Sequence, residues 1–123
     1  MSVSCLMVGA AMFMLPSGQF TLEWTHSIEK TVWREDWIIE DDRLRLTQAA
    51  IKGSGAGMEP GDGAILRQGW WVWTPELAPV PDLLLAASGA TGAGWRVCAK
   101  SGECLEIGED AGRPQLLRAC PDT

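Results

Sequence analysis

The clearest alternation of apolar and polar positions lies between residues 20 and 37. In the first arm of this stretch, Phe20, Leu22 and Trp24 fall on one face and polar side chains fall on the other. In the second arm one face is formed by Trp33, Glu35, Trp37 and Ile39. A period of two, with many Trp, Thr and Ile residues, predicts two facing strands joined by a polar connection. A helix over 28–39 is the alternative, but the β-branched and aromatic content argues against it.

Shorter segments with the same period follow along the chain. A third strand is predicted over 43–52, where Leu44, Leu46, Gln48 and Ala50 alternate with Arg43, Arg45, Thr47 and Ala49. A hairpin-like pair is predicted over 64–66 and 69–74, and later strands over 83–88, on both sides of 100–102, and over 115–120. Eight or nine short strands without a persuasive helix predict an all-β fold, either an antiparallel β-sandwich or a partly open barrel.

The start of the chain differs in kind, because residues 2–15 are uncharged and mostly apolar. A run of this length is too short to span a bilayer comfortably and fits the apolar part of a secretory signal. We therefore expect a signal-like leader or anchor over 1–18 and a single β-domain over 19–123, in a periplasmic or otherwise exported protein. No positively charged segment precedes the run, so either the true start lies upstream of Met1 or the leader stays uncleaved. The alternative is a buried first strand, against which the low β-propensity of residues 9–11 argues.

Length and charge narrow the class of protein. A chain of 123 residues is long enough for one domain with its own core, and an apolar content of 46% excludes disorder. The formal net charge of −6 argues against binding of nucleic acid or anionic membrane surfaces, because both reward clustered Lys and Arg. Membrane contact is therefore expected only through an uncleaved leader.

The cysteines agree with an oxidising compartment. Cys98 and Cys104 flank a Gly-containing turn, and with a three-residue loop over 100–102 and Gly102 in the left-handed region they face each other directly. Opposed residues of this kind come close enough for a disulfide. A two-residue turn would shift the register, and Cys104–Cys120 would then compete. Either way a structural disulfide is expected, with one thiol left over.

The same cysteines give little support for a metal site or for a redox-active cysteine pair. Cys5 would be lost with the leader, no CxxC is present, and the single histidine is distant in sequence. The spacing is unlike a zinc site and unlike a redox-active pair. We predict no metal and no cofactor.

The segment 25–29 offers a nucleophile, a base and an acid, a combination used by hydrolases. Neighbouring residues of a strand point to opposite faces, so His26 and Ser27 are not expected to hydrogen-bond through their side chains. His26 is instead predicted as a polar anchor at a strand end, bonded to Glu29, Glu35 or the backbone. We therefore assign no catalytic residue.

A glycine-rich stretch over 53–63 lacks the pattern of a phosphate loop. It is either a wide connection between strands or a ligand loop, since long loops in compact domains are often functional. If the loop folds back, Glu59 approaches the strand end that carries His26. The predicted ligand- or partner-binding surface is His26, Ser27, Glu29, Glu35, Gly55, Gly57 and Glu59.

A cluster of tryptophans over 70–73 is apolar on both faces of its predicted strand. Trp71 and Trp73 fall on one face, with Trp70 and Val72 on the other. Such tryptophans either fill the core or, where exposed, stack on sugar rings or a partner.

The run FTLEWTHSIEKTVWREDW, followed by IKGSGAGMEP and GWWVW, resembles a bacterial family known as a domain of unknown function (number 1850). The resemblance covers residues 20 to about 120. It implies an N-terminal export or anchor segment and an association with TRAP-type (tripartite ATP-independent periplasmic) solute transporters of the TAXI subclass. His26, Ser27, Glu29 and the loop 53–59 match the family's recurring motif, whereas the usual basic start is missing.

Residues and resemblance together predict a non-catalytic exported accessory or binding domain, serving such a transport system. The expected partners are membrane transporter components or a small solute. The alternative is a small secreted hydrolase or carbohydrate-binding module that uses His26 with Glu35 or Glu59, or the face formed by 70–73.

Overall fold

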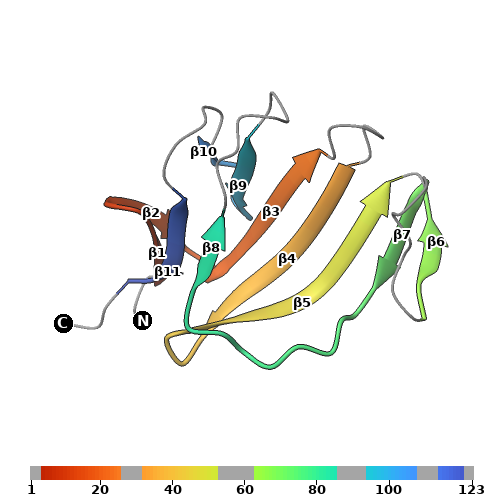
Figure 1. The fold of residues 1–123 in the computed structure, drawn as a ribbon, viewed down its shortest axis with the longest axis horizontal. Helices are drawn as coiled ribbons and strands as arrows, with labels where there is room; N and C mark the ends of the chain where they lie inside the picture. Colours follow the sequence, from red (N-terminus) through yellow and green to blue (C-terminus); the bar gives the residue numbers. More distant parts are fainter. Residues whose placement is uncertain (1–3, 26–31, 53–62, 86–93, 108–113, 121–123) are drawn as a thin grey trace.

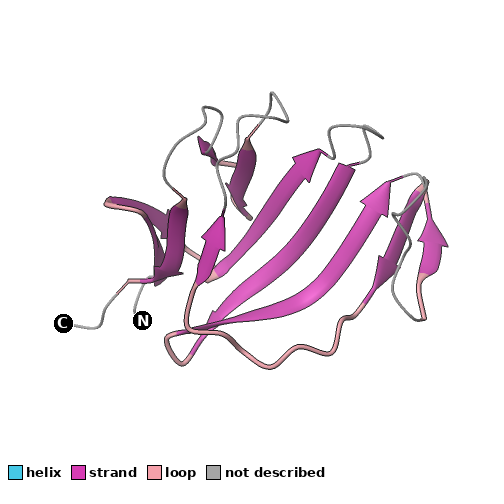
Figure 2. Cartoon of the chain, viewed as in Figure 1, coloured by secondary structure: helices cyan, strands magenta, loops and turns pink. Residues whose placement is uncertain are grey.

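The computed structural model describes residues 4–25, 32–52, 63–85, 94–107 and 114–120, and strands dominate it (Figures 1 and 2). In this part of the chain eleven strands form two antiparallel sheets, and there is no helix, so none that could cross a membrane. The all-β prediction is confirmed as an open two-sheet arrangement. The count exceeds the predicted eight or nine chiefly because the apolar N-terminal run contributes two strands.

The larger sheet has seven strands in the order β10-β9-β3-β4-β5-β7-β6. Its members are β3 (Gln19–Thr25), β4 (Val32–Glu40), β5 (Arg43–Lys52), β6 (Ile65–Arg67), β7 (Trp70–Trp73), β9 (Trp95–Ala99) and β10 (Cys104–Ile107). Two-residue turns with positive φ join β4 to β5 at Asp41-Asp42 and β6 to β7 at Gln68-Gly69. Turns with two positive φ angles match the twist of a hairpin, and Asp and Gly are among the residues that tolerate them.

The smaller sheet has four strands in the order β2-β1-β11-β8. They are β1 (Ser4–Val8), β2 (Ala11–Leu15), β8 (Leu83–Leu85) and β11 (Gln115–Ala119). The apolar N-terminal run therefore forms a hairpin. The alternative of a buried first strand fits β1, whereas β2 is mostly exposed. A role of residues 1–18 in export stays a prediction. Cleavage after residue 18 would remove half of this sheet.

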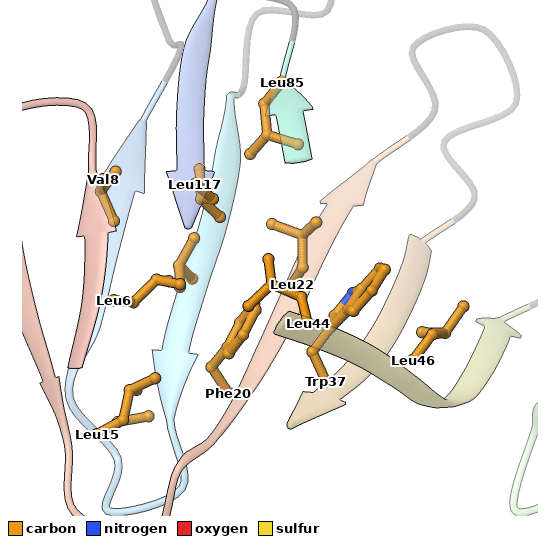
Figure 3. Close-up of a cluster of buried hydrophobic side chains, with 12 residues drawn as sticks. Leu6, Val8, Leu15, Phe20, Leu22, Trp37, Leu44, Leu46, Leu85 and Leu117 are labelled. Carbon is orange, nitrogen blue, oxygen red and sulfur yellow. The ribbon is translucent and has the colours of Figure 1, made fainter. Parts of the chain in front are cut away.

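The hydrophobic core lies between the two sheets (Figure 3). One face of β3, β4, β5 and β9, here called the inner face, packs against the smaller sheet. The buried cluster consists of Leu6, Val8, Leu15, Phe20, Leu22, Trp37, Leu44, Leu46, Leu85, Val97, Ala99 and Leu117. Paired backbone hydrogen bonds of 2.7 and 2.9 Å between Leu44 and Val80 guide the chain from the larger sheet to β8.

The predicted pairing of the first two arms is confirmed. In the antiparallel register of β3 with β4, Phe20 lies opposite Trp37, Leu22 opposite Glu35, and Trp24 opposite Trp33. The helix alternative is wrong for the described residues 32–39, which belong to a nine-residue strand. Because opposed residues share a face, Glu35 lies on the apolar inner face.

The predicted alternation along β5 is wrong beyond Thr47. The pairing of β4 with β5 shifts between Asp36 and Trp37, which makes Thr47 an extra residue on β5. Past this β-bulge, Ala49 and Ile51 take the inner face. Gln48 and Ala50, predicted to share a face with Leu44 and Leu46, take the other. The Thr47 hydroxyl donates to the carbonyl oxygen of Asp36 at 3.0 Å. An extra residue on one strand leaves backbone groups unpaired, and this side chain satisfies one of them.

Both ends of the chain are held by a disulfide that the sequence analysis missed. Of the two pairings left open, Cys98–Cys104 is found and Cys104–Cys120 is wrong: Cys98 and Cys104 are directly opposed, their Cα atoms are 4.1 Å apart, and Gly102 has a φ of 107° in a three-residue loop. Cys120 pairs with Cys5, with a Cα–Cα distance of 5.4 Å. The predicted leftover thiol is wrong, since all four cysteines are paired. Discarding Cys5 with the leader hid its partnership with Cys120.

The two disulfides are expected to differ in their contribution to stability. Cys5–Cys120 closes a sequence separation of 115 residues and Cys98–Cys104 one of 6. In the chain-entropy model, removal of the first as Cys5→Ala/Cys120→Ala costs about 5 kcal/mol, against about 2 kcal/mol for Cys98→Ala/Cys104→Ala. Urea denaturation of the oxidised chain measures both. Equal losses in the free energy of unfolding would show that the Cys5–Cys120 disulfide stabilises the fold no more than the local Cys98–Cys104 disulfide.

Candidate functional site

A row of four tryptophans crosses the inner face of the larger sheet. It consists of Trp95 on β9, Trp24 on β3, Trp33 on β4 and Trp73 on β7, and is called here the tryptophan row. The rings of Trp24 and Trp33 are parallel at 5.8 Å, and Trp24 meets Trp95 at 4.7 Å with a tilt of 51°. Trp33 meets Trp73 edge-on at 6.0 Å. Offset and edge-on pairs of this kind are the favoured geometries for aromatic rings.

The tryptophan row is only partly buried, and it extends past the core between the sheets. Trp24 and Trp95 pack against the core cluster from its edge, whereas Trp33 and Trp73 lie outside that cluster. The row spans β5 at Ala49 and Ile51, the residues that the bulge turns to the inner face. Small and aliphatic side chains there let rings on β4 and β7 meet across the intervening strand.

Glu35 is the carboxyl group associated with this row. It lies on β4 between Trp33 and Trp37, opposite Leu22 on one side and Ala49 on the other. Its Oε1 accepts a hydrogen bond of 3.1 Å from Nε1 of Trp37. Ala49 is in turn paired with Trp73, so a single cross-strand row contains Leu22, Glu35, Ala49 and Trp73.

Burial sets the protonation of this carboxyl. Desolvation of Glu35 among apolar side chains raises its pKa above the ordinary value, and the hydrogen bond from Trp37 only partly opposes the rise. A carboxyl that can lose its proton inside an aromatic surface provides either a donor or a negative charge, depending on pH. Carboxyl groups with shifted pKa values are common at functional sites, although structural ones occur too.

Most of the predicted surface falls outside the described residues. His26, Ser27, Glu29, Gly55, Gly57 and Glu59 belong to that group, so their predicted meeting stays a prediction. The strand ends beside these segments are described. Thr25 pairs with Val32, and Val32 pairs with Lys52, so the strands lead into both segments from one end of the larger sheet. Glu35 lies three residues along β4 from that end, roughly 10 Å away.

The predicted alternation over 70–73 is confirmed by the pairing of β5 with β7. Trp71 and Trp73 lie on the inner face, opposite Ile51 and Ala49. Trp70 lies on the opposite, outer face, where the guanidinium of Arg34 sits 4.5 Å from its ring centroid and Nζ of Lys52 sits 5.7 Å away. A ring engaged by two cations is a poor candidate for sugar stacking, so only the inner tryptophans remain candidates for that role.

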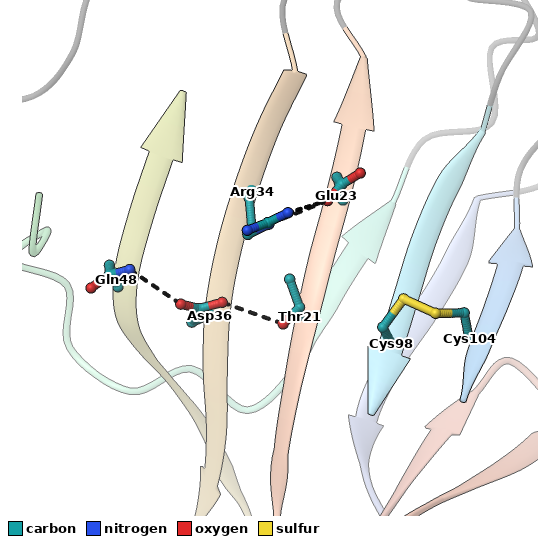
Figure 4. A network of polar contacts seen from close by, with 7 residues as sticks. All are labelled: Thr21, Glu23, Arg34, Asp36, Gln48, Cys98 and Cys104. Atoms are coloured by element: carbon teal, nitrogen blue, oxygen red, sulfur yellow. Dashed lines mark hydrogen bonds and ion pairs between the residues drawn. A yellow bond between two sulfur atoms is a disulfide. The ribbon is translucent and has the colours of Figure 1, made fainter. Parts of the chain in front are cut away.

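Polar side chains form the outer face (Figure 4). Arg34 pairs with Glu23 at 3.2 Å, and one row further along, Asp36 accepts hydrogen bonds from Thr21 at 3.3 Å and from Gln48 at 3.4 Å. Near Asp36 this face is hollowed by a groove of about 460 Å³, called here the outer groove. Its polar lining comes from Gln19, Thr21, Asp36, Arg45, Thr47 and Lys100.

The sequence analysis missed the outer groove, because its lining comes from four separate segments whose register the sequence does not show. The only local signal was the break in alternation at Thr47. Within the described ranges, no group of three or more His, Cys, Asp or Glu side chains could hold a metal ion.

The family model described as Domain of unknown function (DUF1850) matches residues 20–106. The chain belongs to this family. The matched range of this DUF1850 chain contains the tryptophan row, Glu35 and the Cys98–Cys104 hairpin, and it omits β1, β2 and β11. No curated protein and no solved structure matches the chain.

Replacement of Glu35 in the DUF1850 chain is expected to change how stability depends on pH. The folded-state pKa of Glu35 is raised, so its contribution to stability is present below the unfolded pKa and is lost as the pH rises through the folded pKa. Glu35→Gln stays neutral and keeps an oxygen that can accept from Trp37. We expect the variant to have the higher melting temperature at pH 8, with the difference shrinking or vanishing at pH 4.

Thermal unfolding followed by circular dichroism at the two pH values checks this expectation. The matched control is Glu103→Gln, which removes a carboxylate from the exposed β9–β10 turn. It is expected to show a smaller pH-dependent difference. A Glu35→Gln variant that is less stable than the parent at pH 8 would mean that the ionised carboxylate is favoured in the fold.

Proposed function

We propose that this chain is a non-catalytic binding domain that works in the periplasm or another exported location, as an accessory of a TRAP-type solute transport system. In this proposal, the tryptophan row and Glu35 form the binding surface. The segments that contain His26 and the glycine-rich loop complete that surface from the adjacent end of the sheet.

The observation that carries the proposal is a partly exposed aromatic surface that includes a desolvated carboxyl. Tryptophans are enriched at binding sites because one ring offers a large apolar area with a polar N–H at its edge. Trp33 and Trp73 meet nearly at right angles, with an interplanar angle of 82°. These two rings share the inner face with Glu35, so apolar surface and one polar group lie on the same face, as in many small-molecule sites.

The disulfides support a periplasmic or other exported location. All four cysteines are paired, one bridge closing a local hairpin and the other joining residues near the two ends of the described chain. Structural disulfides persist in the periplasm and outside the cell and are rare in the cytosol. The bridges therefore fit an extracellular or periplasmic location.

Family membership supports the proposed association of this chain with a TRAP-type transporter. Membership of DUF1850 is shown over residues 20–106, and the resemblance in the sequence analysis implies an association with TAXI-type TRAP transporters. A small binding domain beside such a transporter would contact either its membrane component or its solute. We propose the membrane component as the first partner to test.

Co-purification tests this proposal. The tagged full chain is expressed with a TAXI-type membrane component in the same cells, and the membranes are solubilised in mild detergent. We expect the membrane component to be recovered with the parent chain and to be reduced about tenfold with Trp73→Leu, as for loss of an interface tryptophan. Trp70→Leu, three residues away on the opposite face, is the matched control and is expected to retain recovery.

Circular dichroism first confirms that both variants fold. Failure of the parent chain to recover the membrane component would contradict the association with the transporter. Equal recovery with the Trp73→Leu and Trp70→Leu variants would instead contradict the tryptophan row as the surface.

A second candidate, a carbohydrate-binding module or small hydrolase, is favoured by the same partly exposed rings beside a carboxyl. Sugars stack on aromatic faces, and a carboxyl with a raised pKa is suited to donate a proton. If this candidate holds, tryptophan fluorescence shifts with a panel of glycans and the shift is lost in Trp73→Leu. Hydrolysis of a glycan, if present, would be abolished by Glu35→Gln or His26→Ala. If no glycan shifts the tryptophan fluorescence and none is hydrolysed, the carbohydrate-binding or hydrolase function is contradicted.

A further inference from the structure

We propose that the outer groove is a second binding site, for a small zwitterionic solute of the α-amino acid class. The groove lies on the outer face, whereas the tryptophan row lies on the inner face. The groove is lined by the first residues of β3. The opposite end of the sheet holds the last residue of β3, the first of β4 and the last of β5, next to residues 26–31 and 53–62. The two sites therefore share neither face nor strand end.

The groove has the size of a small-molecule site. Its volume of about 460 Å³ falls within the range of roughly 300–1,000 Å³ that is typical for ligand pockets. The groove is also lined by Phe20 and Trp37, which belong to the inner face, and by Ile38, which belongs to the outer face. Because the side chains of Phe20 and Trp37 are buried on the inner face, the apolar side chain in the groove is that of Ile38.

Two cationic side chains flank the groove. Lys100 extends from the β9–β10 turn, and Arg45 belongs to β5. Strands β3 and β4 run between them, so their backbones are three strand spacings apart, roughly 14 Å. Nε of Arg45 is engaged by Glu40 at 3.1 Å, and the terminal nitrogens of the guanidinium take no part in that ion pair. The two flanks can therefore present Nζ and guanidinium N–H groups to a carboxylate.

A carboxylate lies on an intervening strand, one row further along the sheet than these cations. Asp36 is partly buried, and it is positioned by Thr21, which donates to Oδ1, and by Gln48, which donates to Oδ2. Each oxygen can accept more than one hydrogen bond, so the group still offers acceptor capacity. It is therefore suited to bind an ammonium.

The β-bulge gives this part of the sheet its irregular shape. Because Thr47 is an extra residue opposite Asp36, its side chain joins the lining of the groove while its hydroxyl donates to the Asp36 carbonyl. Bulges recur beside functional sites, where they re-aim side chains. The bulge thus adds Thr47 to the lining, and the Thr47 hydroxyl holds the backbone that carries the carboxylate.

The order of charges selects the ligand. Two cations at the flanks of one row and an anion in the next row complement a molecule whose carboxylate and ammonium are a few ångströms apart. A simple anion would satisfy Lys100 and Arg45 but would face repulsion from Asp36. A simple cation would satisfy Asp36 and face repulsion from the flanks. An α-amino acid carries both groups on the same carbon atom and satisfies all three.

A nuclear magnetic resonance titration of the ¹⁵N-labelled chain tests the site. The probe is an equimolar mixture of the twenty common α-amino acids, followed by each one separately. We expect shifts at the backbone amides of Thr21, Asp36, Thr47 and Lys100. The binding amino acid is then compared with its analogue that lacks the ammonium and its analogue that lacks the carboxylate. Each analogue is expected to bind at least about tenfold more weakly, as for a lost charged hydrogen bond.

Variants connect the shifts to the groove. Lys100→Gln changes an exposed residue of a turn that is already held by a disulfide, and it is expected to weaken binding about tenfold. Lys52→Gln, at the opposite end of the sheet, is the matched control and is expected to leave the affinity unchanged. Asp36→Asn is expected to abolish the preference for the amino acid over the analogue without the ammonium.

Three results would overturn the proposal. The first is the absence of shifts at these amides up to about 10 mM probe, the weak limit of a useful solute affinity. The second is equal binding of the analogue without the ammonium, which would make the groove an anion site only. The third is equal weakening by Lys100→Gln and Lys52→Gln, which would reveal a nonspecific charge effect. None of these results depends on whether the tryptophan row binds a transporter.

Discussion

The antiparallel register of β3 with β4 is the constraint on which the rest of the structure depends. It aligns Phe20 with Trp37 and Trp24 with Trp33, so that aromatic side chains of these two adjacent strands share the inner face. Side chains alternate strictly along a strand, so a slip of one residue would exchange the two faces. It would place Arg34 and Asp36 against the core. The same register that buries Phe20 therefore forces Glu35 onto the apolar face and creates the site.

The β-bulge at Thr47 changes the positions of side chains on both faces of the larger sheet. On the inner face it brings Ala49 and Ile51 into position, and Trp33 and Trp73 can meet over them. On the outer face it places Thr47 beside Asp36 and adds to the hollow between Arg45 and Lys100. One inserted residue thus links the geometry of the tryptophan row to that of the outer groove. The disulfide between Cys5 and Cys120 acts elsewhere, by tying β1 to the end of β11 in the sheet that covers the core.

Local patterns in the sequence predicted the parts of the fold that depend on local rules. Alternation predicts β3 and β4. A three-residue loop around Gly102 predicts the pairing of Cys98 with Cys104, whereas a two-residue turn would exclude it. The Thr47 bulge could not be predicted, because its signal is a break in alternation that becomes visible only against a partner strand. The sequence does not show that Cys5 belongs to a strand, because an uninterrupted apolar run suits a signal and a strand that is apolar on both faces equally well. For the candidate site, Glu35 was selected from the sequence, whereas its hydrogen bond to Trp37 and the outer groove depend on long-range register.

The position of Glu35 on the apolar face can be measured directly through its carboxyl carbon. In a ¹³C nuclear magnetic resonance titration of the folded chain, the resonance is assigned by comparison with Glu35→Gln and followed from acid to neutral pH. Desolvation on the inner face predicts a pKa above that of an ordinary glutamate. A pKa at or below the ordinary value would place the carboxyl in water or beside a cation, and would contradict both the β3–β4 register and the site built on it.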